Sequence, residues 1–124
     1  MLVRDIMTSP VISIAPDISL QDAYRTMQER GIRHLPVVAD ARLVGVITDR
    51  DLRLATSALA PSPFPPGGKV SAVMCKTPLT ADPFDPVEDA ARIMREQKIG
   101  CLPVTDDDQL VGIITGLVIE GRQK

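Results

Sequence analysis

The chain has 124 residues, of which 44% are hydrophobic, and a formal net charge of −2 at pH 7. It lacks a basic surplus and has only one tyrosine, two phenylalanines and no tryptophan, which argues against a nucleic-acid partner. No apolar run approaches the roughly 20 residues that span a membrane, and the start of the chain has no signal-peptide pattern. We therefore expect a cytoplasmic protein without a membrane partner.

Each half of the chain begins with the same three predicted elements. A short helix is expected over residues 3–7 and again over 70–74, and each is followed by a loop that contains proline. A short strand follows, over residues 11–14 in the first half and 79–81 in the second.

An amphipathic helix comes next in both halves. Leu20, Ala23, Tyr24 and Met27 have helical spacing, and the same spacing returns from Val87 onwards. In the first half Ser19 is the expected N-cap. In the second half the expected N-cap is Asp85, with Pro86 at the first helical position.

Each half then contains two strands joined by a short polar link. The strands are expected over residues 35–38 and 43–48, and again over 102–105 and 110–115. A closing helix follows Thr48, capped by Thr48 or Asp49. The order β-α-β-β-α in each half predicts an α/β fold.

The two halves are a sequence repeat. Residues 20–52 align without a gap with residues 87–119, and 15 of these 33 positions are identical. The predicted organisation is a first motif over 1–55, a Pro/Gly-rich linker over 56–69 and a second motif over 70–124. Each half is near the lower size limit for a core of its own, so we expect one shared core. The linker is a plain connector or, alternatively, a ligand for a proline-binding partner.

Three motifs carry a family resemblance: VRDIM at residues 3–7, IRHLPV at 32–37 and GVITDRDL at 45–52. In this order, and repeated, they resemble a tandem pair of CBS (cystathionine β-synthase) domains, a Bateman module. The resemblance implies two β-α-β-β-α CBS motifs packed about a pseudo-two-fold axis, with two clefts. It also implies a regulatory module that binds AMP, ADP, ATP or S-adenosylmethionine as a regulatory ligand, without another cofactor, and that forms a homodimer.

The resemblance assigns the first cleft to Thr48 and Asp51, which match its ribose-binding Thr-x-x-Asp pattern. A carboxylate suits the paired hydroxyls of a ribose. Alternatively, Asp51 is a solvated first-turn residue of the closing helix. The facing wall would come from the second copy: Pro78, Leu79, Thr80, Ile99, Gly100 and Cys101.

The second cleft retains Thr115 but has Val118 at the aspartate position. Its facing wall would be formed by Pro10, Val11, Ile12, Ile32, Arg33 and His34, with Arg50 nearby. Arg33, His34 and Arg50 could form a cationic corner for phosphate. Alternatively, the arginines are ordinary exposed charges and His34 is a strand-entry histidine. Two hypotheses follow: a nucleoside in the Thr48/Asp51 cleft, or an anion in the Thr115 cleft.

The other reactive side chains do not indicate catalysis. Cys75 and Cys101 are expected as small, partly buried hydrophobic residues, although a metal site with His34 is conceivable. His34 has no evident orienting acid, and the acidic residues 106–108 suit a solvated turn. We therefore expect no enzyme activity.

The alternative function is a structural dimerisation module with vestigial clefts. The apolar run Leu117-Val118-Ile119 favours burial against a second subunit. An unidentified effector protein in trans would receive the signal of a regulatory module.

Overall fold

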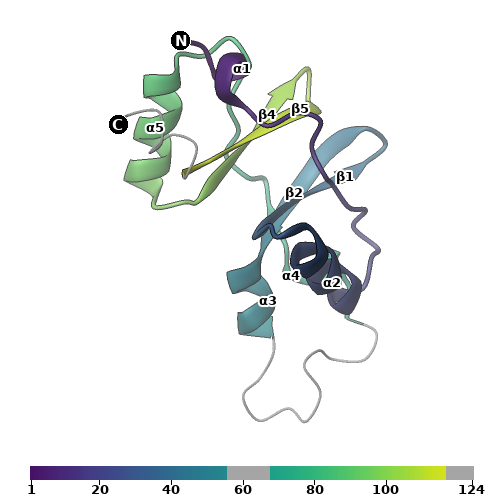
Figure 1. Cartoon of the computed structure of the whole chain (residues 1–124). Helices are drawn as coiled ribbons and strands as arrows, with labels where there is room; N and C mark the ends of the chain where they lie inside the picture. Colours follow the sequence, from purple (N-terminus) through teal and green to yellow (C-terminus); the bar gives the residue numbers. More distant parts are fainter. Residues whose placement is uncertain (56–67, 117–124) are drawn as a thin grey trace. The chain divides into compact units, whose positions relative to one another are not determined.

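The computed structural model describes residues 1–55 and 68–116, which belong to two compact units (Figure 1). The central unit is Ile12–Pro78. The terminal unit combines Met1–Val11 with the second half of the chain from Leu79 onwards. In both units helices accompany an antiparallel hairpin, which confirms the predicted α/β class.

The central unit is built on the antiparallel pair β1 and β2. The short strand β3 pairs antiparallel with β2. Its elements are α2 (Leu20–Arg30), β1 (His34–Ala39), β2 (Arg42–Thr48), α3 (Asp49–Ala55), α4 (Val70–Val73) and β3 (Cys75–Lys76).

The terminal unit repeats this plan with β4 and β5 as its antiparallel pair. Its described elements are α1 (Val3–Ile6), α5 (Val87–Gln97), β4 (Cys101–Asp106) and β5 (Gln109–Thr115).

The short opening helix of each repeat belongs to the unit formed by the other repeat. In the terminal unit, Val3 N donates to Asp85 O at 2.8 Å. In the central unit, Val70 N donates to Ile18 O at 2.9 Å. Each unit is therefore completed by a segment that is distant in the sequence.

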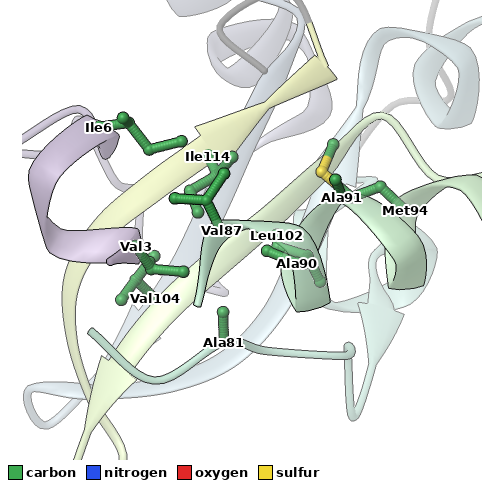
Figure 2. Close-up of a cluster of buried hydrophobic side chains, with 10 residues drawn as sticks. All are labelled: Val3, Ile6, Ala81, Val87, Ala90, Ala91, Met94, Leu102, Val104 and Ile114. Atoms are coloured by element: carbon green, nitrogen blue, oxygen red, sulfur yellow. The ribbon is translucent and has the colours of Figure 1, made fainter. Parts of the chain in front are cut away.

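Each unit encloses its own hydrophobic cluster, so the single shared core expected from the sequence is replaced by two. Figure 2 shows Val3 and Ile6 of α1 beside the side chains of β4, β5 and α5. In the central unit Val70 of α4 takes the corresponding part, with Leu35 and Ile47. The exchanged helices supply the apolar surface that a half of this size lacks.

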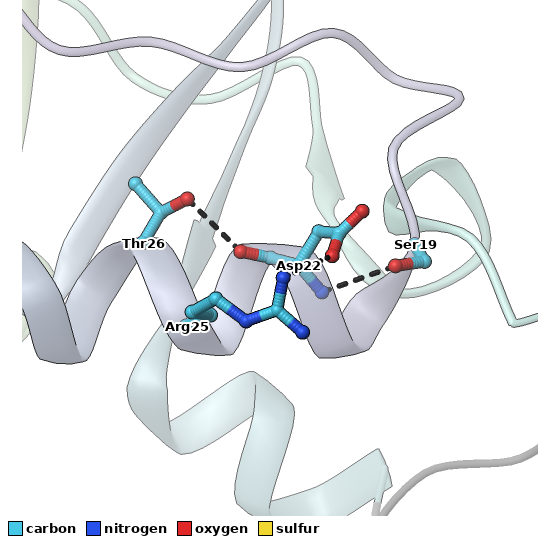
Figure 3. Close-up of polar contacts among 4 residues, drawn as sticks. All are labelled: Ser19, Asp22, Arg25 and Thr26. Carbon is cyan, nitrogen blue, oxygen red and sulfur yellow. Dashed lines mark hydrogen bonds and ion pairs between the residues drawn. The ribbon is translucent and has the colours of Figure 1, made fainter.

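The predicted cap of α2 is confirmed (Figure 3). Asp22 N donates to Ser19 Oγ at 3.0 Å, Thr26 Oγ1 donates to Asp22 O at 2.9 Å, and Arg25 pairs with the Asp22 carboxylate at 3.3 Å. These bonds fix the first turn of the helix.

The predicted cap of α5 is wrong. The N-cap is Pro86, the helix begins at Val87, and no side chain caps it. The Asp85 carboxylate instead accepts a hydrogen bond from Asp82 N at 3.0 Å, which holds it in the preceding turn.

The hairpin turns are shorter than predicted. Asp40-Ala41 and Asp107-Asp108 join the strands, and all four residues have positive φ, as two-residue hairpin turns of this hand require.

The two short strands expected before the amphipathic helices are reduced to single bridging residues. Ile14 bridges Val37 in the central unit, and Ala81 bridges Val104 in the terminal unit. Each segment meets its neighbouring strand at one residue only, so no ladder forms.

Some predictions lie outside the described residues. They concern the linker at residues 56–67 and the apolar run with Leu117 and Val118, so the homodimer stays a prediction. Within residues 1–55 and 68–116, every helix is too short or too polar to cross a membrane.

Candidate functional site

Two candidate residues face each other across the first hairpin. His34, the first residue of β1, pairs with Thr48, the last residue of β2, and the next pair along the hairpin is Leu35 with Ile47. Directly paired residues share a face of the sheet, and successive residues alternate between faces. Since Leu35 and Ile47 lie in the core cluster, His34 and Thr48 lie on the opposite face of the hairpin.

Thr48 and Asp51 hold each other at the start of α3. Thr48 N donates to Asp51 Oδ2 at 2.9 Å, and Asp51 N donates to Thr48 Oγ1 at 3.1 Å. This reciprocal pair is a capping box, and both side chains are half-buried. The first turn of α3 therefore fixes the position and orientation of the Asp51 carboxylate.

The alternative interpretation of Asp51 is confirmed in its place in the first turn of α3, but the residue is half-buried rather than solvated. Capping occupies only part of the hydrogen-bonding capacity of the Asp51 side chain, because an ionised carboxylate has about four acceptor positions. Thr48 N occupies one of them. A ribose could therefore be bound by the same carboxylate, and its ribose-binding role stays a prediction.

Arg33 and His34 lie beside this capping box in the central unit. Asp49 N donates to Arg33 O at 2.9 Å, which joins the entry of β1 to the start of α3. The Arg33 side chain is exposed. The expected ribose-binding and phosphate-binding residues of the first repeat thus lie at one end of one unit, while their division between two clefts stays a prediction.

His34 is not a cation at neutral pH. Burial has the largest effect and lowers the pKa of His34 below its usual 6.5. The carboxylates of Asp49 and Asp51 raise this pKa and the Arg33 guanidinium lowers it, and the net shift is downward. The positive charge of the expected cationic corner therefore comes from Arg33 and from Arg50, which is exposed on α3.

Asp49, expected from the sequence only as a cap, also lies beside Arg33 and His34. Its backbone N–H donates to Arg33 O, and its carboxylate raises the pKa of His34. It also pairs with Arg53 at 3.6 Å. Its position directly after Thr48 was the signal that could have indicated this role.

The terminal unit repeats the backbone of this site without its charges. Cys101 pairs with Thr115, and Gly116 N donates to Gly100 O at 3.2 Å, as Asp49 N does to Arg33 O. Cys101 is buried, and burial raises its pKa to about 12, so it remains a neutral thiol. This end of the terminal unit is therefore uncharged at the positions equivalent to Arg33 and His34.

The remaining candidates are divided between the units. Ile32 and Ile99 occupy equivalent places, each half-buried against the core cluster of its own unit. Their assembly with Asp51 or Thr115 into clefts stays a prediction. The central unit also contains Ile12 and Pro78, and the terminal unit contains Pro10, Val11, Leu79 and Thr80.

The two cysteines differ in exposure. Cys101 is buried, as expected, whereas the expectation that Cys75 is partly buried is wrong, because it is exposed on the short strand β3. Among the described residues, no group of three or more histidine, cysteine or acidic side chains could hold a metal ion. The alternative metal site at His34, Cys75 and Cys101 therefore gains no support.

The two repeats of this fold match a known protein family. The family model described as "CBS domain" matches residues 3–57 and 70–116. The chain therefore belongs to the CBS domain family and contains two copies of the domain, which confirms the resemblance seen in the sequence.

Similar proteins span nearly the whole chain. This chain is 39% identical to a CBS domain-containing protein of Dictyostelium discoideum, and the match covers 92% of this chain and 85% of that protein. Its fold matches the CBS domain pair of protein MJ0100 in complex with 5′-methylthioadenosine and S-adenosyl-L-methionine (TM-score 0.88, 31% identity, 100% and 98% coverage). It also matches CBSX2 in complex with AMP (TM-score 0.87, 32% identity, 98% and 95% coverage).

Proposed function

We propose that this CBS domain pair is a regulatory module that binds an adenosine-containing ligand, and that Asp51 accepts hydrogen bonds from the ribose hydroxyls. The observation that carries the proposal is the capping box between Thr48 and Asp51. It holds a half-buried carboxylate in a fixed orientation and leaves acceptor positions open. Such preorganisation reduces the entropy lost on binding.

The similar proteins support the same ligand class. The ligands named for the two similar structures are 5′-methylthioadenosine, S-adenosyl-L-methionine and AMP. Their common part is adenosine, and its ribose is the group that a carboxylate recognises through paired hydroxyls. A role as a sensor, rather than as a catalyst, agrees with the match of the chain to the CBS domain family.

Calorimetric titration with AMP and 5′-methylthioadenosine tests the proposal. In Asp51→Asn the side-chain oxygen can still accept from Thr48 N, so the cap is retained while the anionic acceptor is lost. Hydrogen bonds to a charged group contribute about 1.5–3 kcal/mol, so binding of both ligands should weaken by roughly 10- to 100-fold. Equal affinity in the variant and the wild type would contradict the role of Asp51.

Asp22→Asn is the matched control. Asp22 is also an aspartate three residues after an N-cap, but it lies on α2, is exposed and pairs with Arg25. Its replacement should leave both affinities unchanged.

The competing function is a structural dimerisation module, which the neutral Gly100 and Cys101 of the terminal unit favour for one half of the chain. A ligand that binds only the folded state raises the melting temperature by mass action. A thermal-shift screen with AMP, ADP, ATP, S-adenosylmethionine and phosphate therefore separates the two functions. The absence of a shift with all five compounds would favour the structural role.

A further inference from the structure

We propose that His34 takes up a proton when a ligand that carries a phosphate group binds beside Asp51, so that the affinity for such a nucleotide rises as the pH falls. This inference rests on the proposed function and adds the ligand class, a phosphate-bearing nucleotide. It assigns the protonation step to the single histidine of the chain.

The geometry places His34 next to the proposed ribose-binding group. His34 pairs with Thr48 across the hairpin, and Thr48 is hydrogen-bonded to Asp51 in both directions. Directly paired side chains lie on the same face of a sheet, with Cβ atoms about 5 Å apart. We infer that the 5′ substituent of a ribose held by Asp51 is within reach of the imidazole, so that one ligand contacts residues that the resemblance assigned to two clefts.

Charged groups surround His34 on two sides. Arg33 precedes it at the entry to β1, while Asp49 and Asp51 act on it from the first turn of α3. Asp49 is partly neutralised by Arg53, with which it pairs at 3.6 Å. The exposed Arg33 guanidinium supplies a permanent positive charge that attracts a phosphate to this corner.

The proton balance follows from these surroundings. In the free protein burial dominates and keeps the pKa of His34 below 6.5, so the imidazole is neutral at pH 7. An opposite charge within about 4–6 Å raises the pKa of such a group by about 1–3 units. A bound phosphate would thus raise the pKa of His34, and the imidazole would take a proton from solvent as the nucleotide binds.

Proton uptake by His34 distinguishes ligands that share adenosine but differ in the charge of the 5′ group. AMP carries a phosphate, whereas 5′-methylthioadenosine is uncharged at its 5′ end. It therefore provides no negative charge that would raise the pKa of His34. The preference for AMP over 5′-methylthioadenosine should therefore increase as the pH is lowered.

The single histidine makes the protonation step directly observable. The imidazole resonances of His34 are followed by NMR during a pH titration of the free protein, of the protein saturated with AMP, and of the protein saturated with 5′-methylthioadenosine. We expect the midpoint to lie below that of an unperturbed histidine in the free protein, to rise by about one pH unit or more with AMP, and to stay in place with 5′-methylthioadenosine. An unchanged midpoint with AMP would overturn the inference.

Calorimetric titrations over about pH 6.8–8 provide the second readout, because the phosphate of AMP has lost its last proton above its second pKa of about 6. AMP affinity should fall with rising pH, by up to about tenfold per pH unit, and the affinity for 5′-methylthioadenosine should be constant. In His34→Gln the pH dependence for AMP should disappear, whereas the control Asp22→Asn, which lies on α2, should retain it. An equal pH dependence in His34→Gln would overturn the inference.

The outcomes distinguish this inference from the proposed function. If AMP and 5′-methylthioadenosine both bind in an Asp51-dependent manner but the His34 midpoint does not move, the proton uptake is wrong and the proposed function stands. If neither compound binds, the proposed function is wrong and the inference falls with it.

Discussion

Gly31 and Lys98 end equivalent helices in the same left-handed conformation. Gly31 is the C-cap of α2 with a φ of +64°, and Lys98 is the C-cap of α5 with a φ of +55°. Glycine adopts this conformation freely, whereas a residue with a Cβ atom does so at a steric cost. The two repeats thus place different residues at the same left-handed C-cap, and glycine adopts this conformation at a lower cost than lysine.

Replacement of Lys98 by glycine should stabilise the protein. The left-handed conformation costs a residue with a Cβ about 1–2 kcal/mol, so Lys98→Gly should raise the free energy of unfolding by about 1 kcal/mol. The reverse change, Gly31→Ala, should lower it by a similar amount, although a Cβ at Gly31 would meet no atom within 4 Å. Urea denaturation measures both, and a Lys98→Gly variant less stable than the wild type would contradict this account.

Gly45 lies close to Met74, the C-cap of α4, and Gly112 lies close to Met7, the C-cap of α1. A Cβ built on Gly45 would lie 2.6 Å from Met74 Sδ and 2.9 Å from the carbonyl oxygen of Cys75. A Cβ built on Gly112 would collide with the Met7 side chain alone. Since overpacking costs about 1–3 kcal/mol, both alanine variants should be destabilised, and Gly45→Ala more than Gly112→Ala.

The double variants separate the two kinds of contact. Met7→Ala combined with Gly112→Ala should recover most of the loss caused by the added Cβ, because a flexible side chain is the obstacle. Met74→Ala combined with Gly45→Ala should not, because the backbone oxygen of Cys75 remains. Equal recovery in both double-mutant cycles would show that the carbonyl contact has no effect.

The exchange of the opening helices predicts where a core mutation acts. Val3 and Val70 occupy equivalent repeat positions and are both fully buried, Val3 in the cluster of the terminal unit and Val70 in that of the central unit. Alanine at either position should cost about 2 kcal/mol. Hydrogen exchange should report the loss of protection in β4 and β5 for Val3→Ala, and in β1 and β2 for Val70→Ala.

The opposite distribution of protection, with Val3→Ala acting on β1 and β2, would contradict the assignment of α1 to the terminal unit.

The buried thiol of Cys101 predicts a loss of stability at alkaline pH. Its pKa is about 12 in the folded protein, against 9.0 for an unperturbed thiol. Between these values the unfolded state releases a proton that the folded state retains, so stability falls as the pH rises above about 9, by up to about 1.4 kcal/mol per pH unit. Cys101→Ala should lose this part of the dependence, and an unchanged alkaline slope in the variant would contradict the burial of the thiol.

The sequence predicted features that depend on local pattern. Ser19 could be identified as a cap because its hydroxyl and Asp22 stand at the required spacing, and the two hairpins could be identified because their apolar runs flank short polar links. The Thr48–Asp51 pair was identified through the resemblance to CBS domains, and its capping box emerged only from the structure.

Features that depend on distant contacts were not predicted. Val3 and Val70 look alike in the sequence, and nothing local indicates which unit each completes. The cap expected from Asp85 failed for a local reason instead, because its carboxylate accepts a hydrogen bond from Asp82 N in the preceding turn.

The pairing of His34 with Thr48 was also not predicted, because it depends on a shift in strand register. The pairing of β1 with β2 shifts by one residue between Val37 and Val38. Without this shift, His34 would pair with Ile47, whose side chain faces the core. A one-residue change of register reverses the face of every side chain, and the sequence carries no clear signal of it.

Calorimetric titration of AMP into the wild-type chain and into Asp51→Asn, with Asp22→Asn as the control, tests the central claim most directly. The account predicts saturable binding to the wild type and to Asp22→Asn, and an affinity lower by about 10- to 100-fold in Asp51→Asn. Binding of the same strength to all three proteins, or to none of them, would contradict it.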